Sequence, residues 1–178
     1  MPDADRPDIL VFFSDQHNAL VNGYAGDRVV RTPTLDALAA QGTAFDAAYT
    51  ACPLCVPARV AFMTGHSTRT TRVYRNDGAI RGDQATWAHA LAAAGYETVL
   101  VGRMHFIGPD QRCGFTQRLV GDCCDPFWGG SREGGAFQEL LGDYGPTRGM
   151  GGCLNFVGGG GVSPVLQYDE LVIQAALD

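Results

Sequence analysis

The sequence predicts an α/β fold built on a mostly parallel sheet that is sandwiched by helices. Two short apolar runs, at residues 9–13 and 96–102, have the composition of buried strands. Helical patterns lie between them at 32–42, 58–64 and 85–94. Strand-like runs separated by helices are typical of a parallel sheet with crossover helices.

The helical patterns carry start and stop signals in the sequence. Thr32 can cap the first helix, Pro33 suits its first turn, and Gly42 suits its end. Gly65 and Gly95 follow the second and third helices in the same way.

Three further segments complete the pattern. Residues 43–50 alternate enough to predict another strand, whereas 142–161 are rich in glycine and predict loops. Residues 168–178 begin a helix that has no stop signal. We therefore expect residues 1–178 to be the N-terminal part of one larger domain, with a fold that is incomplete at the C-terminus.

Charge and hydropathy exclude several classes of protein. The net charge of −6 argues against nucleic acid as a partner, since phosphate contacts need clustered cations. We expect no membrane contact, because no apolar run is long enough to span a bilayer. The polar N-terminus does not resemble a secretory signal, so a cytoplasmic location is expected. All 13 basic residues are arginine, so an anion site must use Arg or His.

Six cysteines are too few for a disulfide scaffold in a chain of this length. The later four match no paired C-x2-C zinc pattern, so buried, reduced thiols are expected. These four are Cys113, Cys123, Cys124 and Cys153.

Cys55 stands just before Pro57, which favours the first turn of a helix. A nucleophile at a helix N-terminus shares the positive field that binds an anion. Arg59, four residues later, could bind phosphate or sulfate oxygens through two hydrogen bonds. The spacing alone leaves two alternatives open, a redox pair with Cys52 or a merely buried thiol.

Four segments in order point to a family. Residues 55–65, CVPARVAFMTG, contain C-x-P-x-R followed by a helix and T-G. They accompany DILVFFSDQH at 8–17, TPTLDALA at 32–39 and GRMHFIGPDQ at 102–111. Together these segments resemble the sulfatases of the alkaline-phosphatase-like superfamily, in their choline-sulfatase-like form.

The resemblance implies how the nucleophile and the metal are supplied. In sulfatases the signature cysteine is oxidised to formylglycine by a maturation enzyme, and Cys55 occupies that position. It also implies a divalent metal held by Asp15, Gln16 and the modified Cys55. Ca²⁺ is the metal expected first, with Mn²⁺ or Mg²⁺ as alternatives.

The resemblance assigns roles to three further residues. Arg59 contacts the nucleophile and the substrate anion, Arg103 binds the anion, and His105 moves a proton. Arg103 and His105 alternate on a segment that we expect to be extended, so both can face one way.

Three positions depart from the usual pattern of the family. Ala58 replaces a serine, Gln16 replaces the second acid of the metal motif, and Arg103 replaces a lysine. Gln16 still offers a carbonyl oxygen and Arg103 keeps its charge, while the core C-x-P-x-R survives around Ala58.

The expected function is therefore hydrolysis of a sulfate monoester, with a small anionic sulfate ester as the partner. A phosphonate or phosphodiester substrate is the neighbouring alternative. A truncated, inactive fragment is the second alternative, because sulfatases take further metal ligands from later sequence. Homo-oligomer formation is left open for a full-length protein.

Overall fold

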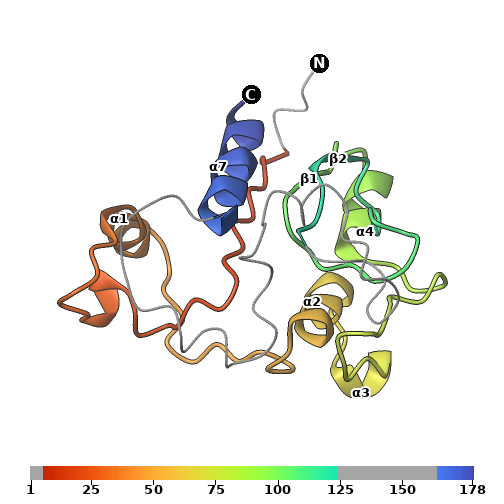
Figure 1. The fold of residues 1–178 in the computed structure, drawn as a ribbon, viewed down its shortest axis with the longest axis horizontal. Helices are drawn as coiled ribbons and strands as arrows, with labels where there is room; N and C mark the ends of the chain where they lie inside the picture. Colours follow the sequence, from red (N-terminus) through yellow and green to blue (C-terminus); the bar gives the residue numbers. More distant parts are fainter. Residues whose placement is uncertain (1–5, 124–163) are drawn as a thin grey trace. The chain divides into compact units, whose positions relative to one another are not determined.

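The computed structural model describes residues 6–123 and 164–178 (Figure 1). They fall into two compact units, Met1–Ala48 and Tyr49–Asp178, and each is described by itself.

The first unit is organised around the helix α1 (Pro33–Gln41), which confirms the first predicted helix. The Thr32 hydroxyl does not cap the helix amides as predicted. Instead it accepts the Gly23 N–H at 2.8 Å and donates to Asp36 Oδ1 at 2.9 Å. These bonds tie the short 3-10 helix η1 (Gly23–Ala25) to the first turn of α1.

Two predicted strands of the N-terminal region are wrong. Residues 9–13 and 43–50 belong to no helix or strand, and their apolar side chains are exposed. Leu10 is 92% exposed and Tyr49 is 91% exposed. An apolar run becomes a buried strand only where other layers cover it, and the described residues do not provide that cover.

The second unit contains a parallel pair of strands, β1 (Val99–Val101) and β2 (Gln117–Val120). The predicted strand at 96–102 is thus confirmed over its second half, whereas β2 was not predicted. The parallel direction is as expected, but the sheet has only these two strands within the described residues. Thr116 anchors the start of the pair by donating its amide to the Thr98 carbonyl at 2.9 Å.

The predicted second and third helices are confirmed with shifted ends. Helix α2 (Cys55–Thr64) begins three residues before the predicted start and ends at Gly65, whose φ is 68°. The short helix α3 (Thr68–Thr71) follows. Helix α4 (Trp87–Ala93) is capped by Thr86, whose hydroxyl accepts the His89 amide while the His89 ring accepts the Thr86 amide. His89 is therefore a structural capping residue.

Two apolar clusters hold α2 in place. One joins α2 and α4 to β1 and the segments after it. The other lies between α2 and the chain that follows α3. The first consists of Met63, Ala88, Leu100, Met104, Phe106, Cys113 and Phe115, and the second of Val56, Val60 and Val73.

The last helix, α7 (Pro164–Leu177), begins before the predicted start at residue 168. Its Tyr168 hydroxyl donates to the Gly121 carbonyl at 2.7 Å, just after β2. The glycine-rich segment 142–161 lies outside the described residues. No helix among the described residues is long and apolar enough to cross a membrane.

We predict that Met63→Ala destabilises the second unit by about 2–5 kcal/mol, because it opens a cavity in the first apolar cluster. Met63 is fully buried, at 0% exposure. The exposed Leu171→Ala change in α7 is the control and should stay within about 0.5 kcal/mol. Urea unfolding of the two variants measures both effects, and equal midpoints would contradict the assigned core.

Candidate functional site

Helix α2 presents Cys55 at its first residue, as the sequence predicted. The Val56 amide, in the same turn, donates to Asn76 Oδ1 at 3.1 Å. This bond joins the helix N-terminus to the turn at residues 75–78, where the Gly78 amide donates to the Arg75 carbonyl at 3.2 Å. Cys55 itself is half-buried, so it is both held in place and accessible.

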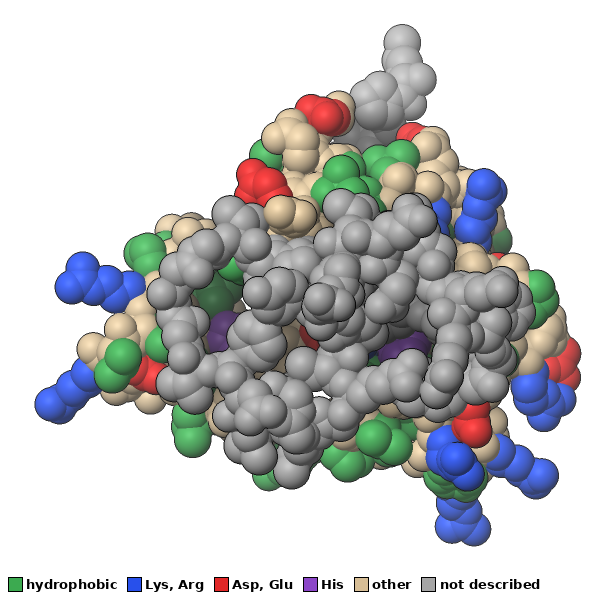
Figure 2. All heavy atoms as spheres, viewed as in Figure 1, with side chains coloured by type: hydrophobic (Ala, Val, Ile, Leu, Met, Phe, Trp, Pro, Cys, Tyr) green, Lys and Arg blue, Asp and Glu red, His purple; other side chains and the backbone are tan. Residues whose placement is uncertain are grey.

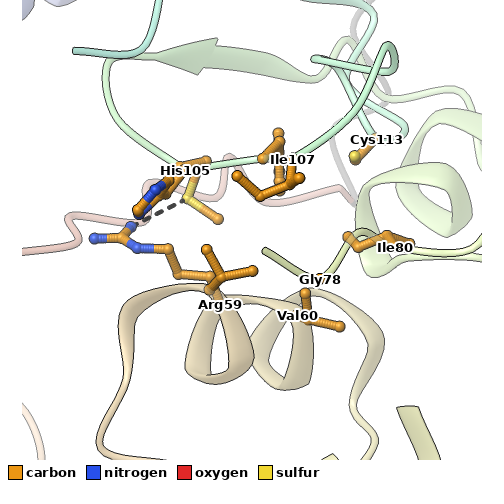
Figure 3. Close-up of a pocket in the computed structure, with 10 residues that line it drawn as sticks. Arg59, Val60, Gly78, Ile80, His105, Ile107 and Cys113 are labelled. Carbon is orange, nitrogen blue, oxygen red and sulfur yellow. Dashed lines mark hydrogen bonds between the residues drawn. The ribbon is translucent and has the colours of Figure 1, made fainter. Parts of the chain in front are cut away.

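Arg59 lies one turn further along α2 and is only 3% exposed. Its Nη1 donates to the Arg103 carbonyl at 3.2 Å and lies 3.8 Å from the Met104 sulfur. Figure 3 shows the side chain reaching from the helix toward the segment that carries His105. In contrast, the arginines that project from the surface in Figure 2 are solvated, as Arg75 is with 80% of its side chain exposed.

The segment after β1 brings Arg103 and His105 to Arg59, but it is not extended as predicted. His105 has a φ of 52°, which is the left-handed region, and Gly102 before it has a φ of 91°. The simple alternation of a strand is therefore broken at His105. Contact with Arg59 nonetheless places both residues of the predicted pair beside α2.

His105 is buried, at 3% exposure. Burial lowers the pKa of its imidazole from the ordinary value, because the charged form loses its hydration. The positive charges of Arg103 and Arg59 lower the pKa further, while the Asp122 carboxylate opposes them. His105 is therefore held as the neutral imidazole, which can accept a proton.

A narrow cavity lies between α2 and this segment (Figure 3). Arg59 and His105 line it together with mainly apolar side chains. Cys55 and Arg103 are not part of its lining, although both adjoin residues that are. The other lining residues are Val56, Val60, Gly78, Ile80, Met104, Phe106, Ile107 and Cys113.

Cys52, Cys55 and Cys113 are free thiols. Cys113 is buried, which raises the pKa of its thiol to about 12, and the charge of Asp110 acts in the same direction. The expectation of a buried, unreactive thiol is confirmed for Cys113. Cys124 and Cys153 lie outside the described residues.

Asp15 and Gln16 belong to the first unit, where both are exposed and Gln16 has a φ of 56°. Next to them, the His17 ring donates to the Val21 carbonyl at 2.9 Å. The described residues contain no group of three or more His, Cys, Asp or Glu side chains that could hold a metal. Asp15 and Gln16 provide the hard oxygen donors that Ca²⁺ prefers, but two donors do not complete its coordination.

The family model described as Sulfatase matches residues 7–142, which is more than half of the chain. The chain belongs to the sulfatase family. This confirms the resemblance inferred from the four segments.

Two curated sulfatases and one solved structure illustrate the similarity. The choline-sulfatase of Rhizobium meliloti (strain 1021) is 43% identical over 117 residues, which cover 66% of this chain and 23% of that protein. The N-acetylglucosamine-6-O-sulfatase of Bacteroides thetaiotaomicron is 32% identical, covering 69% of this chain and 23% of that protein. The structure of BT4656 in complex with its substrate D-glucosamine-2-N,6-O-disulfate has a TM-score of 0.50 and 31% identity, covering 54% of this chain and 19% of that one. The chain spans about a quarter of the length of the curated relatives it matches.

Two structural roles in this sulfatase chain were not predicted from the sequence. Asn76 anchors the start of α2 by accepting the Val56 amide. Asp122 was not singled out at all, yet its carboxylate accepts the amides of Met104 and His105. Nothing in the spacing of these residues signals the contacts, because each joins segments that are well separated in the chain.

The side-chain amide of Gln111 donates to the carbonyls of Phe106 and Gly108, both at 2.8 Å. Asp110 accepts the amides of Arg112 and Cys113 at 2.9 Å each. Both side chains therefore stabilise the loop after His105.

We predict that the fold loses stability on acidification through His105. Its pKa in the folded state lies below the ordinary histidine value of 6.5, so the unfolded chain binds the proton more readily. The contribution is fully present above pH 6.5 and is lost as the pH falls from there toward the lower folded-state pKa.

The measurement is urea unfolding from neutral to mildly acidic pH, with His105→Gln compared with the wild type. The wild type should lose more stability on acidification than His105→Gln does. The exposed His66→Gln change is the control and should follow the wild type. An equal loss in the wild type and His105→Gln would contradict the buried, neutral imidazole.

Proposed function

We propose that this chain forms the nucleophile-bearing part of a sulfuric ester hydrolase that cleaves a sulfate monoester with a formylglycine made from Cys55. One observation carries the proposal. The buried Arg59 guanidinium, one turn after Cys55, bonds to the backbone of the segment that holds Arg103 and His105. In a member of the sulfatase family, this contact supports a site made of the nucleophile position, two arginine cations and a neutral histidine base.

Cys55 occupies a favourable place for attack on an anion. The first turn of a helix carries a partial positive charge, which lowers the energy of negative charge beside it. The half-burial of Cys55 leaves its side chain accessible to a maturation enzyme and to substrate. Formylglycine made from Cys55 would supply a hydrated aldehyde as the nucleophile at this position.

Arg59 and Arg103 are proposed to bind the sulfate group of the substrate. A guanidinium stays protonated even when it is buried, and its planar array of N–H groups matches the oxygens of an oxyanion. Burial of Arg59 also limits screening by water, so its charge acts more strongly on a bound anion. These two side chains orient the sulfate and stabilise the charge that develops on its oxygens.

His105 is proposed to act as the proton acceptor of the reaction. Its lowered pKa keeps the imidazole neutral around neutral pH, so a ring nitrogen can accept the proton released when sulfate is expelled. Most of the side chains that line the adjacent cavity are apolar.

Asp15 and Gln16, together with the modified Cys55, are the residues proposed to contribute ligands to a divalent metal. Ca²⁺ is the first choice for oxygen donors, with Mn²⁺ or Mg²⁺ as alternatives. When bound, such a metal supplies Lewis-acid stabilisation of negative charge. Among the described residues, no group of three or more His, Cys, Asp or Glu side chains completes this donor set.

The substrate is proposed to be a small anionic sulfate ester. The relatives named for choline sulfate and for a sulfated sugar support this class. A phosphonate or phosphodiester has similar charge and geometry and is the alternative substrate within the family. The alkaline-phosphatase-like sheet and the cytoplasmic location remain predictions of the same proposal.

A second candidate is an inactive chain. It is favoured by the incomplete donor set of the described residues. This candidate keeps the fold of the nucleophile segment but predicts no turnover.

The proposal predicts that co-expression with a formylglycine-generating enzyme converts Cys55. Mass spectrometry of the tryptic peptide should show the mass decrease for replacing CH₂SH by an aldehyde, and the chain should then release sulfate from choline sulfate. Cys55→Ala should abolish release, whereas the matched Cys52→Ala control should retain it. A converted chain without turnover on sulfate, phosphonate or phosphodiester substrates would favour the inactive candidate, and an unconverted Cys55 would contradict the proposed nucleophile.

Arg59→Lys should lower kcat by about 10²–10³-fold, the range for loss of one transition-state donor. Lysine keeps the charge but loses the planar group that bonds to the Arg103 carbonyl. Steady-state kinetics of the converted protein measure this loss, with the exposed Arg69→Lys change as the control. A kcat equal to that of the control would remove Arg59 from the proposed site.

A further inference from the structure

One carboxylate holds the backbone of the segment that carries Arg103 and His105. Asp122 Oδ2 accepts the N–H of Met104 at 2.9 Å and also the N–H of His105. The Asp122 side chain is only 5% exposed. Two consecutive amides on one buried carboxylate fix the direction of the peptide planes on both sides of Met104.

Arg118 pairs with this carboxylate and hydrogen-bonds to both ends of the segment 102–111. Its Nη2 lies 3.5 Å from Asp122 Oδ2 and donates to the Gly102 carbonyl at 3.2 Å. Its Nη1 donates to the Gln111 carbonyl at 2.8 Å. Because Arg118 belongs to β2, the strand adjacent to β1 supports the loop that leaves β1.

The conformation of His105 explains why such support is needed. A φ of 52° lies in the left-handed region, which residues other than glycine seldom adopt. Such a conformation persists where the surrounding bonds determine it, and this is typical of functional sites. Asp122 supports this conformation by accepting the His105 amide. After His105, the Gln111 side chain donates to the carbonyls of Phe106 and Gly108.

We propose that Asp122 is a positioning residue that, together with Arg118, aims Arg103 and His105 at the substrate anion. This inference rests on the proposed function of those two residues. Asp122 acts through them, because its carboxylate accepts the backbone amides of Met104 and His105 and pairs with Arg118. A carboxylate this close to an anion site would otherwise repel the substrate, and the two amides and the guanidinium offset its charge.

The charges that face His105 provide a readout of this role. Arg103 and Arg59 lower its pKa, and Asp122 raises it. Removal of the Asp122 charge therefore leaves the two cations unopposed and lowers the pKa of His105 further.

The test compares Asp122→Asn with the wild-type chain, using NMR first. The substitution keeps the size of the side chain and one acceptor oxygen but removes the charge. We expect the amide protons of Met104 and His105 to move upfield as their bonds weaken, and the His105 ring to titrate at lower pH. Asp83→Asn is the matched control, because it removes an exposed aspartate paired with Arg81 and should change neither signal.

Activity gives the second readout in the protein with converted Cys55. We expect Asp122→Asn to lower kcat by about 10–100-fold, the range for groups that orient a functional ligand. The acid limb of the pH profile should move to lower pH, in step with the His105 titration. Asp83→Asn should retain the wild-type rate and profile.

Unchanged amide shifts, His105 titration and kcat in Asp122→Asn would overturn the inference. If Cys55→Ala were inactive in the same assay, the proposed function would stand and only the positioning role would fall. If the wild type lacked turnover, the proposed function would fall, and the NMR shifts alone would decide the positioning role.

The single variant can leave Arg118 buried without its partner. If it does not fold, the charge-neutral double variant Arg118→Gln/Asp122→Asn is measured in its place. Shifted Met104 and His105 amides in that chain support the inference, and wild-type shifts overturn it.

Discussion

The bond between the Arg59 guanidinium and the Arg103 carbonyl is the contact on which the arrangement of the candidate site depends. It connects the helix that begins at Cys55 to the segment that follows β1. Because Arg59 is buried, the bond also fixes a permanent charge between these elements. The apolar clusters on either side of α2 make this burial feasible, since they hold the helix at the distance from which the side chain can reach. Packing therefore sets the position of the cation, and the cation sets the electrostatics of the site.

The helices could be predicted from the sequence, because their signals are local. Gly65 ends α2 in a left-handed turn, and Thr86 begins α4 with a capping box, so both boundaries are decided within a few residues. The strands were predicted less accurately than the helices. β1 and β2 form because Thr98 and Thr116 bring together segments that a loop separates. Residues 9–13 have the composition of a strand, but composition does not supply the neighbouring layers that a buried strand requires.

The same distinction separates the predicted and unpredicted parts of the site. Cys55, Arg59, Arg103 and His105 stand in segments whose spacing carries the family pattern, and the structure brings the last three together. Asn76 and Asp122 act through contacts with backbone amides, for which many residue types at many spacings would serve. Asp15 and Gln16 belong to the other unit, so their relation to Cys55 remains a prediction.

The charges around His105 show how the segment can combine anion binding with a neutral base. Arg59, Arg103 and Arg118 place cations near it, and the Asp122 carboxylate is engaged by Arg118 and by two amides. The remaining positive field favours an oxyanion and at the same time disfavours protonation of the imidazole. Burial acts in the same direction on His105. Since arginine does not lose its proton in such surroundings whereas lysine can, a chain without lysine keeps this field over a wide range of pH. The buried Arg59, together with Arg103, thus accounts for both the affinity proposed for sulfate and the neutral proton acceptor proposed beside it.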